Sequence, residues 1–557
     1  MSNGMTYRMR LWLMAVMTLL TAGCADYEAD EAVERHARLA ADSLYVNLRI
    51  INGSEGAVTR VADADEKATA AENRIYDGIL CIFVGTDESS AELKAACVID
   101  QRIDQATTSA SGNTSETNII QRLPSEKLDL SSYNYDTNTL YALLLLNVSH
   151  TGLTVSNTGT LYYKGAAIPD ADSNGKITIT DLQRLKLTSI GSIDESSSAP
   201  YADPSFHTGL FMSNAPRYES SSVKILTPIS SSSLYANWNA ASAGSNQTTI
   251  YVERAAAKVM VSSGTPTISF NLNESGTTSF HRMTWMPDNT APCYYAVRNT
   301  VSRSDWTWSA NMNWAYSPNY DGSATLNSIA GKEFSVYQQH SLKDGAVGYV
   351  MENTTNAANA TPEHLTRVIV EVQLKDASSM LLGDCFAFNG VTDKLYTSSG
   401  QLITAMKSWW DTNKASLSTT YPDIYTKTAD EIFLSPVVII NSDYSVTLTL
   451  TNGSFTVSEQ SDLGKLANEL GNKTIGYREG RRYYSATIQH TTGSPKAESP
   501  YNLGDYGVVR SNYYKLTLGN ITTIGSPTPV LPFVVPISLK LYVVDWKSGG
   551  SFPLTPK

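Results

Sequence analysis

The feature that most constrains this chain is a series of short apolar runs with a period of two. They recur after residue 40 and are rich in Val, Ile, Leu and Tyr: LYVNLRII, ILCIFVG, LYALLLLNV, RVIVEVQL, SVTLTL, YYSATIQH, YYKLTL and ISLKLYVV. Turns rich in Gly, Asn, Ser and Thr separate them, and such alternation is typical of strands that bury one face. We therefore expect an all-β protein built of sandwiches.

Length and charge limit the remaining choices. The chain has 557 residues, 42% of them apolar, which allows roughly two to four domains. A boundary is expected where the turn-forming SSGTP follows the apolar segment 251–261. A net charge of −11 argues against a basic footprint for nucleic acid or an anionic membrane surface. Short helical patterns at 181–187, 402–413 and 458–470 are expected to decorate loops.

The first 24 residues have the layout of an export signal. Arg8 and Arg10 precede the apolar run LWLMAVMTLL, which is too short to span a bilayer. The following TAGC resembles the lipobox of bacterial lipoproteins, in which the cysteine, here Cys24, becomes the lipidated N-terminus. Thr21 stands where Leu is commonest, so ordinary signal cleavage nearby remains an alternative. We expect an exported protein that is held at a membrane, if at all, by lipid.

The other four cysteines give no metal-binding pattern. Cys81, Cys97, Cys293 and Cys385 lack CxxC spacing and a histidine at zinc-ligand distance. Cys81 lies inside ILCIFVG, where a small buried apolar side chain is expected. A disulfide between Cys81 and Cys97 is the alternative in an exported protein.

The segment DADSNGKITITD is the strongest sign of a metal site. Its oxygen-bearing side chains alternate as in the calcium loop of an EF-hand or a dockerin, and its glycine allows a sharp turn. The candidate ligands are Asp170, Asp172, Asn174 and Asp181. We prefer a simpler interpretation, a turn followed by a strand or helix start with Thr180 as N-cap, and we expect no cofactor.

Aromatic residues cluster in DWTWSANMNWAY and in the later SWWD. They are Trp306, Trp308, Trp314, Tyr316, Trp409 and Trp410. An exposed platform of this kind would stack on sugars, but burial in a sandwich core or a domain joint is the preferred interpretation. No catalytic pattern stands out, since the seven histidines lack HExxH spacing, GxSxG is missing and GKLANELGNKT fails P-loop spacing. We therefore do not expect an enzyme.

Six further segments follow one another along the chain. They are AENRIYDGILCIFVG (71–85), LFMSN (210–214), VERAAAKV (252–259), YVMENT (349–354), YREGRRYYSATIQH (477–490) and YGVVRSNYYKLTLGNITTIGSP (506–527). Together they resemble the fimbrillin family, the major subunits of type V pili in Bacteroidetes, and the last resembles its C-terminal signature. The resemblance implies two transthyretin-like Greek-key β-sandwich domains, a lipidated precursor at the outer membrane, and polymerisation by donor-strand exchange.

The resemblance also implies maturation by an arginine-specific surface protease. Arg60, in GAVTRVADAD, matches the cut position of the family, so Val61 would begin the mature chain. The alternative is that Arg60 is a solvated loop charge. The implied segments are a signal peptide at 1–24, a propeptide at 25–60, an N-terminal domain at 61–262 and a C-terminal domain at 263–557.

Two octets of the same pattern fit the exchange. The removable strand LYVNLRII places on one face Leu44, Val46, Leu48 and Ile50. The candidate donor strand ISLKLYVV places on one face Ile537, Leu539, Leu541 and Val543. The preceding SPTPVLPFVVP favours extended backbone and spans about 34 Å at ~3.1 Å per residue, enough to reach a neighbouring subunit. The alternative is an ordinary edge strand that folds back on its own domain.

The resemblance implies a stalk subunit of a surface fimbria that supports adhesion and biofilm formation. Its expected partners are further copies of itself, accessory fimbrial subunits, the maturing protease, and host or bacterial surface ligands. Its only expected membrane contact is the lipid of the precursor. The alternatives are a tip or anchor fimbrillin and a monomeric glycan-binding surface lipoprotein.

Overall fold

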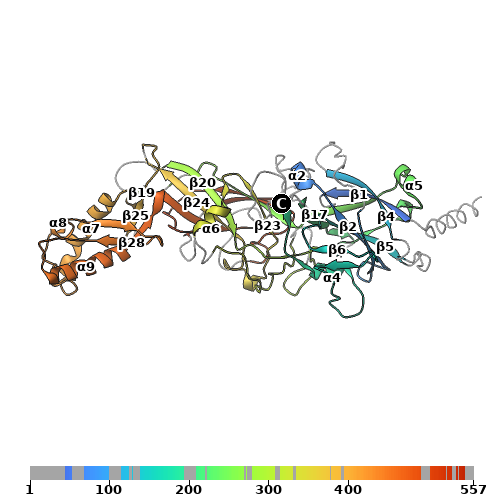
Figure 1. Ribbon diagram of the computed structural model, residues 1–557, viewed down its shortest axis with the longest axis horizontal. Coiled ribbons are helices and arrows are strands. Elements are labelled where there is room, and N and C mark those ends of the chain that lie inside the picture. The colour runs from blue at the N-terminus through green and yellow to red at the C-terminus, as the bar shows by residue number, and fades with distance from the viewer. Residues whose placement is uncertain are drawn as a thin grey trace, which may run out of the picture.

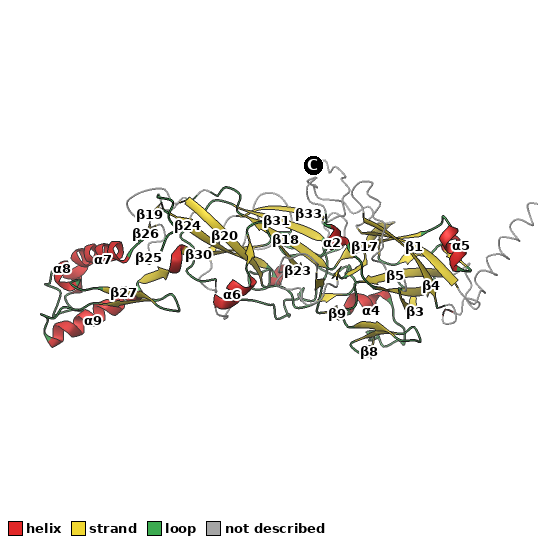
Figure 2. Cartoon of the chain, turned by 45° about the horizontal axis from the view of Figure 1, so that its top comes forward, coloured by secondary structure: helices red, strands yellow, loops and turns green. Residues whose placement is uncertain are grey.

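Strands dominate the structure, as the period-two runs predict, and the all-β fold class is confirmed. The computed structural model describes residues 44–52, 68–99, 115–124, 128, 138–192, 209–219, 222–266, 268, 271–272, 279–307, 314–329, 334–376, 378–389, 394–490, 502–521, 523–529, 535–536 and 539–545. These residues form an elongated body with a large sheet at one end and a helical lobe at the other (Figures 1 and 2). Among them, no helix has the length and apolar character needed to cross a membrane.

The large sheet has nine strands in the order β16-β1-β17-β12-β5-β2-β3, with β4 paired to β1 and β15 paired to β5. Its strands are β1 (Leu44–Asn52), β2 (Gly78–Gly85), β3 (Glu92–Val98), β4 (Ser115–Leu123), β5 (Thr139–Leu146), β12 (Met212–Asn214), β15 (Thr227–Pro228), β16 (Leu234–Tyr235) and β17 (Thr248–Arg254). Helix α5 (Trp238–Ala243) lies beside β1 at this end (Figure 1).

Alternate residues of β2 pack into two cores. Leu80 and Ile82 pack with the apolar residues of β1, β5 and β17 in what we name the first core. Ile79 and Phe83 pack on the opposite face into the joint core, which also receives residues of the second half of the chain. The remaining short elements of this part of the molecule are α2 (Ala70–Asn73), β6 (Leu153–Val155), β7 (Leu161–Tyr163), β8 (Ala166–Ala167), α4 (Ile179–Arg184), β9 (Lys186–Leu187), β10 (Gly191–Ser192), β11 (Gly209–Leu210), β13 (Arg217–Glu219), β14 (Ser222–Lys224), η2 (Ser231–Ser233) and β21 (Tyr294–Tyr295).

A second sandwich follows. A four-stranded sheet in the order β23-β18-β31-β33 faces a five-stranded sheet in the order β22-β20-β24-β30-β32 across one apolar core. Its elements are β18 (Ala256–Ser262), β20 (Ser279–Asp288), α6 (Phe334–His340), β22 (Leu342–Lys343), β23 (Val347–Met351), η3 (Ala357–Asn359), β24 (Arg367–Lys375), β30 (Arg481–Thr487), β31 (Asn512–Leu518), β32 (Val535–Pro536) and β33 (Leu539–Asp545). Since β17 belongs to the first sheet and β18 to the second, the chain crosses between them at Ala255.

The helical lobe has a core of its own, to which the predicted helices contribute directly. Leu402, Met406 and Trp410 of one helix pack with Leu463 and Leu466 of another. The expectation that these helices only decorate loops is therefore wrong, because they form a packed core of their own. Its elements are β19 (Asn271–Leu272), β25 (Cys385–Phe388), β26 (Lys394–Leu395), α7 (Ser399–Asn413), η4 (Lys414–Leu417), α8 (Ala429–Ile432), β27 (Val437–Ile440), β28 (Val446–Thr449), α9 (Val457–Asn472), β29 (Thr474–Tyr477) and η5 (Arg478–Gly480).

Candidate strand-exchange site

Strand β1 is an internal strand of the large sheet and is paired along both edges. All nine of its residues pair antiparallel with β4. On the other edge, β16 pairs with its first half and β17 runs parallel to residues 48–52. The four alternating apolar side chains are buried in the first core: Leu44, Val46, Leu48 and Ile50. The segment that the sequence suggested as removable is thus an integral strand.

Polar contacts hold β1 at three places. The buried Asn47 donates from Nδ2 to the carbonyl oxygen of Ala241 in α5, at 3.2 Å. Arg49 forms an ion pair with Glu116 of β4 at 2.7 Å, and both side chains are partly exposed. At the last residue, the Nδ2 group of Asn52 donates to Asn73 Oδ1 at 3.2 Å. This last contact joins β1 to helix α2.

The C-terminal strand β33 is held differently. It pairs antiparallel with β31, from Leu539 opposite Leu518 to Asp545 opposite Asn512. Among the described strands β31 is its single partner, and β33 forms the edge of its sheet. The candidate donor residues Leu539, Leu541 and Val543 therefore lie on a strand that folds back on its own half of the chain.

A buried polar cluster around Glu72 connects the two sheets. Glu72 Oε2 caps its own helix by accepting from the backbone N–H of Thr69, while Oε1 accepts from Lys258 Nζ at 2.8 Å and from the Tyr349 hydroxyl at 2.6 Å. Burial alone would raise the pKa of the Glu72 carboxyl, but Lys258 and these hydrogen bonds hold it below its usual value. The ionised carboxylate thereby ties α2 to β18 and β23.

Arg254 joins this cluster from the end of β17. It is fully buried, and its guanidinium donates from Nε to the carbonyl oxygen of Glu72 at 3.0 Å and from Nη2 to Asn73 Oδ1. Desolvation lowers the pKa of Arg254 to about 10, against the opposing effect of the Glu72 charge. Asn52 and Arg254 therefore donate to the same oxygen atom.

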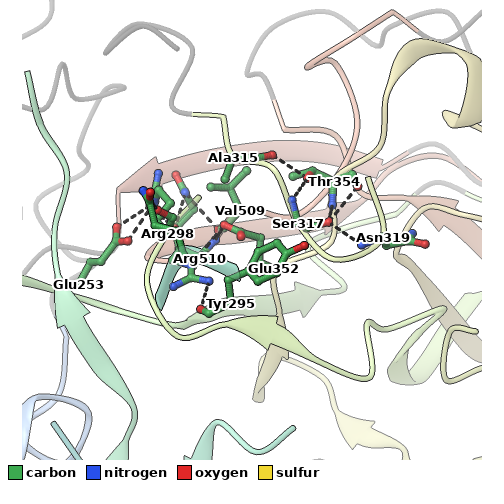
Figure 3. A network of polar contacts seen from close by, with 12 residues as sticks. Glu253, Tyr295, Arg298, Ala315, Ser317, Asn319, Glu352, Thr354, Val509 and Arg510 are labelled. Carbon is green, nitrogen blue, oxygen red and sulfur yellow. Dashed lines mark hydrogen bonds and ion pairs between the residues drawn. The ribbon is translucent and has the colours of Figure 1, made fainter. Parts of the chain in front are cut away.

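A second buried network lies beside it (Figure 3). Glu253 accepts two hydrogen bonds from Arg298, at 3.0 and 2.6 Å, and Arg298 also donates to the carbonyl oxygen of Arg510 at 3.1 Å. Arg510 donates to the carbonyl oxygen of Tyr295 at 2.7 Å and lies 3.4 Å from a carboxylate oxygen of Glu352. Truncating one partner of a buried ion pair costs about 3–5 kcal/mol, so this network fixes how the two halves of the chain pack.

Sequence reasoning missed these networks, although a signal was present. Each of four segments that carry the fimbrillin resemblance contributes a buried charge: Glu72 in AENRIYDGILCIFVG, Glu253 in VERAAAKV, Glu352 in YVMENT and Arg510 in YGVVRSNYY. Charged residues are rarely buried without a partner, so a charge within a segment that is otherwise rich in apolar residues is a candidate for pairing. The distances along the chain, up to 277 residues for Tyr349 and Glu72, concealed which residues pair.

The structure corrects the disulfide alternative. Cys81 lies opposite Ala96 and Cys97 opposite Leu80 on the paired strands β2 and β3. Neighbouring register positions point to opposite faces of a sheet, so the two sulfurs cannot meet. All four cysteines among the described residues are free thiols.

The calcium-like loop makes hydrogen bonds to its own backbone. Asp170 accepts from the N–H groups of Asp172 and Gly175, and Asp181 accepts from Ala171 and Thr178. Among the described residues, no group of three or more His, Cys, Asp or Glu side chains is placed to hold a metal ion. Helix α4 begins after Thr178, which is its N-cap in place of the expected Thr180, because Asp181 at the third helical position completes a capping box with Thr178.

Those residues of the two predicted aromatic clusters that the structure describes do not form an exposed platform. Trp306 and Trp314 are buried in a small cluster with Tyr320, and Trp410 is buried in the helical lobe. Trp409 and Tyr316 are partly buried. Several predicted residues fall outside the described part of the chain: Cys24, Arg60, Val61, Trp308 and Ile537.

Comparisons with known proteins agree with the resemblance read from the sequence. Residues 476–548, which contain β30 to β33, match the family described as major fimbrial subunit protein type IV, fimbrillin, C-terminal. No curated protein sequence matches the chain. A solved fimbrilin from Porphyromonas gingivalis W83 is 12% identical at a TM-score of 0.37, covering 91% of this chain and 98% of that chain.

Two other solved structures are similar over much of the chain. A tip fimbrial protein from Porphyromonas gingivalis with a C-terminal truncation is 9% identical at a TM-score of 0.28, covering 90% of this chain and 100% of that chain. A fimbrial assembly protein from Parabacteroides distasonis ATCC 8503 is 10% identical at a TM-score of 0.30, covering 64% and 92%. The match of residues 476–548 to the C-terminal fimbrillin model is the comparison that supports the resemblance of this chain to the fimbrillin family.

Proposed function

We propose that this chain is a structural subunit of a cell-surface type V pilus that polymerises by donor-strand exchange. The family match supports a fimbrial subunit that assembles with other fimbrial subunits. The observation that carries the finer proposal is the pair β1 and β33. They share one apolar pattern, yet β1 is paired on both edges within its sheet and β33 lies at an edge of its sheet.

In this proposal the precursor is exported as a lipoprotein through Cys24 and cut after Arg60, so that Val61 begins the mature chain. The segment that contains β1 is then no longer covalently attached. Its departure leaves β4 without its partner and leaves β16 and β17 with an open edge. The octet of residues 537–544 from a neighbouring subunit fills this groove. The division into domains at 61–262 and 263–557 remains a prediction.

The cut matters because of effective concentration. A tethered strand competes at an effective concentration in the millimolar range, so a strand from another molecule loses the competition. Cutting the chain at Arg60 removes this advantage without changing any contact in the groove. Strand exchange between subunits then becomes favourable.

The test is Arg60→Ala in the full-length precursor. The variant is expected to keep β1, to remain monomeric and to form no filaments by electron microscopy. Arg74→Ala is the matched control, since Arg74 is exposed and its removal leaves Arg60 and the proposed cut site intact. Filaments formed by uncut Arg60→Ala would contradict the mechanism.

N-terminal sequencing of surface filaments separates the alternatives. A start at Val61 supports a stalk subunit. A start at lipidated Cys24 would assign the protein to the anchor or monomer class. Deleting residues 537–557 should leave a folded, cleavable subunit that cannot donate a strand, and its normal incorporation within filaments would show that the donor lies elsewhere.

A further inference from the structure

A pocket of about 430 Å³ lies at the joint between the two halves of the chain. Its volume falls within the range of roughly 300–1,000 Å³ that is typical of small-molecule sites. The first half of the chain contributes residues 88 and 89 after β2, residues 179, 180 and 183 of α4, and residues 222–225 around β14. The second half contributes residues 300–302 and Thr307. The pocket is thus formed by both halves together.

Hydrogen bonds between α4 and the segment after β21 hold the lining in place. Gln183 donates from Nε2 to the carbonyl oxygen of Arg298 at 2.9 Å, and Asn299 donates from Nδ2 to the carbonyl oxygen of Gln183 at 3.3 Å. The side chain of Arg298 is fixed in turn by its two hydrogen bonds to Glu253 (Figure 3). Asn299 Oδ1 also accepts from the N–H group of Val301 at 3.2 Å. The lining is therefore preformed, which lowers the entropic cost of binding a ligand.

Three polar residues of the lining are almost fully buried. Glu88, Gln183 and Thr300 are 8%, 6% and 7% exposed. A carboxylate has about four acceptor positions, and the N–H group of Ile225 uses one of those of Glu88, at 2.7 Å. Since the NH₂ group of Gln183 donates to Arg298, its amide oxygen is left for another donor, and none of the described residues supplies one. Buried polar groups are normally hydrogen-bonded, so these acceptors indicate a ligand that donates hydrogen bonds.

The charges of the lining balance one another. Glu88 and Lys224 are the charged residues among those that line the pocket, one negative and one positive. Such a lining gives an anion or a cation no general electrostatic advantage over an uncharged molecule. The uncharged polar groups include the hydroxyls of Thr180, Thr300 and Ser302. This composition favours a neutral ligand that is rich in hydroxyl groups.

Aliphatic side chains add a second kind of surface to the pocket. Ile179 and Ile225 are buried, Val223 is partly buried and Val301 is 49% exposed. None of the described lining residues is aromatic, so a ligand is not held by ring stacking. A pyranose ring combines C–H groups, which pack on aliphatic side chains, with hydroxyl groups, which donate and accept hydrogen bonds. The lining matches this combination.

We propose that the pocket binds a neutral hexose unit of a surface glycan. Glu88 and Gln183 accept hydrogen bonds from hydroxyl groups of the sugar, and Lys224 donates to one of its oxygen atoms. Weak binding by one chain gains strength when a filament repeats the site many times. That gain rests on the proposed function, whereas binding of the sugar by a single chain does not.

The first experiment measures binding of methyl glycosides to the full-length protein by saturation-transfer NMR. The panel consists of the methyl glycosides of D-glucose, D-galactose, D-mannose and N-acetyl-D-glucosamine. At least one should bind with a Kd of about 1 mM, which is ordinary for a ligand of this size. N-acetylneuraminic acid, which carries a carboxylate, should bind more weakly. Failure of all four glycosides to bind, or a preference for N-acetylneuraminic acid, would overturn the proposal.

Two variants test whether the sugar occupies this pocket. Lys224→Met should weaken binding about 10-fold, because it removes a charged hydrogen-bond donor. Val301→Trp should abolish binding, because it adds bulk at an exposed position of the lining and alters no buried side chain. Lys176→Met is the matched control, since Lys176 is exposed and lies outside the lining, and it should bind as wild type does. Wild-type binding by Lys224→Met and Val301→Trp would overturn the assignment.

A glycan array distinguishes the sources of the hexose. It carries mammalian N- and O-linked glycans beside bacterial capsular polysaccharides. Signals on either set that Val301→Trp loses would support the site, and signals that persist in this variant would overturn it. Val301→Trp should still form filaments as wild type does. Loss of sugar binding is thereby separated from loss of strand exchange, which the Arg60→Ala variant tests.

Discussion

Strands β1 and β33 have the same alternation of apolar residues but opposite positions in their sheets. β1 is paired on both edges, and its apolar residues lie in the first core. β33 has β31 as its one partner among the described strands. The comparison teaches that pattern alone does not define the role of a strand. A strand whose loss creates a groove must be internal, whereas a strand that a molecule can lend must leave its own sheet intact.

The largest difference in stability between the two strands is expected when an apolar residue of each is replaced by aspartate. Leu48→Asp places a carboxylate in the first core without a partner, and we expect it to destabilise the large sheet by more than about 3 kcal/mol. Leu541→Asp should leave the remaining strands folded, because β33 is held by one strand, but should abolish filament formation. Urea unfolding measures the first effect and electron microscopy the second. Equal destabilisation by both variants would remove the distinction between the strands.

Acid should loosen the β1 end of the molecule more than the β33 end. The pKa of Glu72 is held below its usual 4.5 in the folded protein, so its contribution is complete above that value and is lost as the pH falls through the lower, folded-state pKa. Hydrogen exchange of β1 and β17, corrected for intrinsic rates, should therefore rise below about pH 4.5 relative to that of β31. Glu72→Gln should already be loosened at neutral pH and should show a flatter acid response.

The smallest effect is expected at the surface of β1. Arg49→Ala removes the partly exposed ion pair with Glu116, and we expect a loss of at most ~1 kcal/mol in unfolding free energy. Retention of β1 in the precursor should be unchanged. A loss comparable to that of Leu48→Asp would show that the polar face, and not the first core, holds the strand.

The strand pattern could be predicted from sequence because it is local. The octet 44–51 lies within β1, and the helical patterns at 402–413 and 458–470 lie within α7 and α9. The lobe that these helices form with β25 to β29 could not be predicted, because its core joins residues such as Phe386 and Leu470 that are far apart in the chain. Local periodicity indicates which face of a helix or strand is buried, but not which other elements pack against that face.

The strands of the candidate site could be predicted from the sequence, but the buried charged cluster beside them could not. Alternation identified the four apolar residues of β1, since burial of one face leaves a direct trace in sequence. The cluster of Glu72, Arg254 and Lys258 is visible in the sequence only as charged residues within apolar segments. Which of these charges pair depends on how the two sheets pack against each other. The disulfide alternative failed for a related reason, since a shift of one register position moves a side chain to the other face.

The position of β4 has a kinetic consequence. Among the described strands it pairs with β1 alone, along the full length of that strand. Release of β1 must therefore break the backbone hydrogen bonds on both of its edges at once. It would also leave β4 without its partner strand. In the proposed exchange, such a barrier would keep the uncut subunit long-lived whatever the relative affinities of the two octets, and would delay fibre growth until the cut is made.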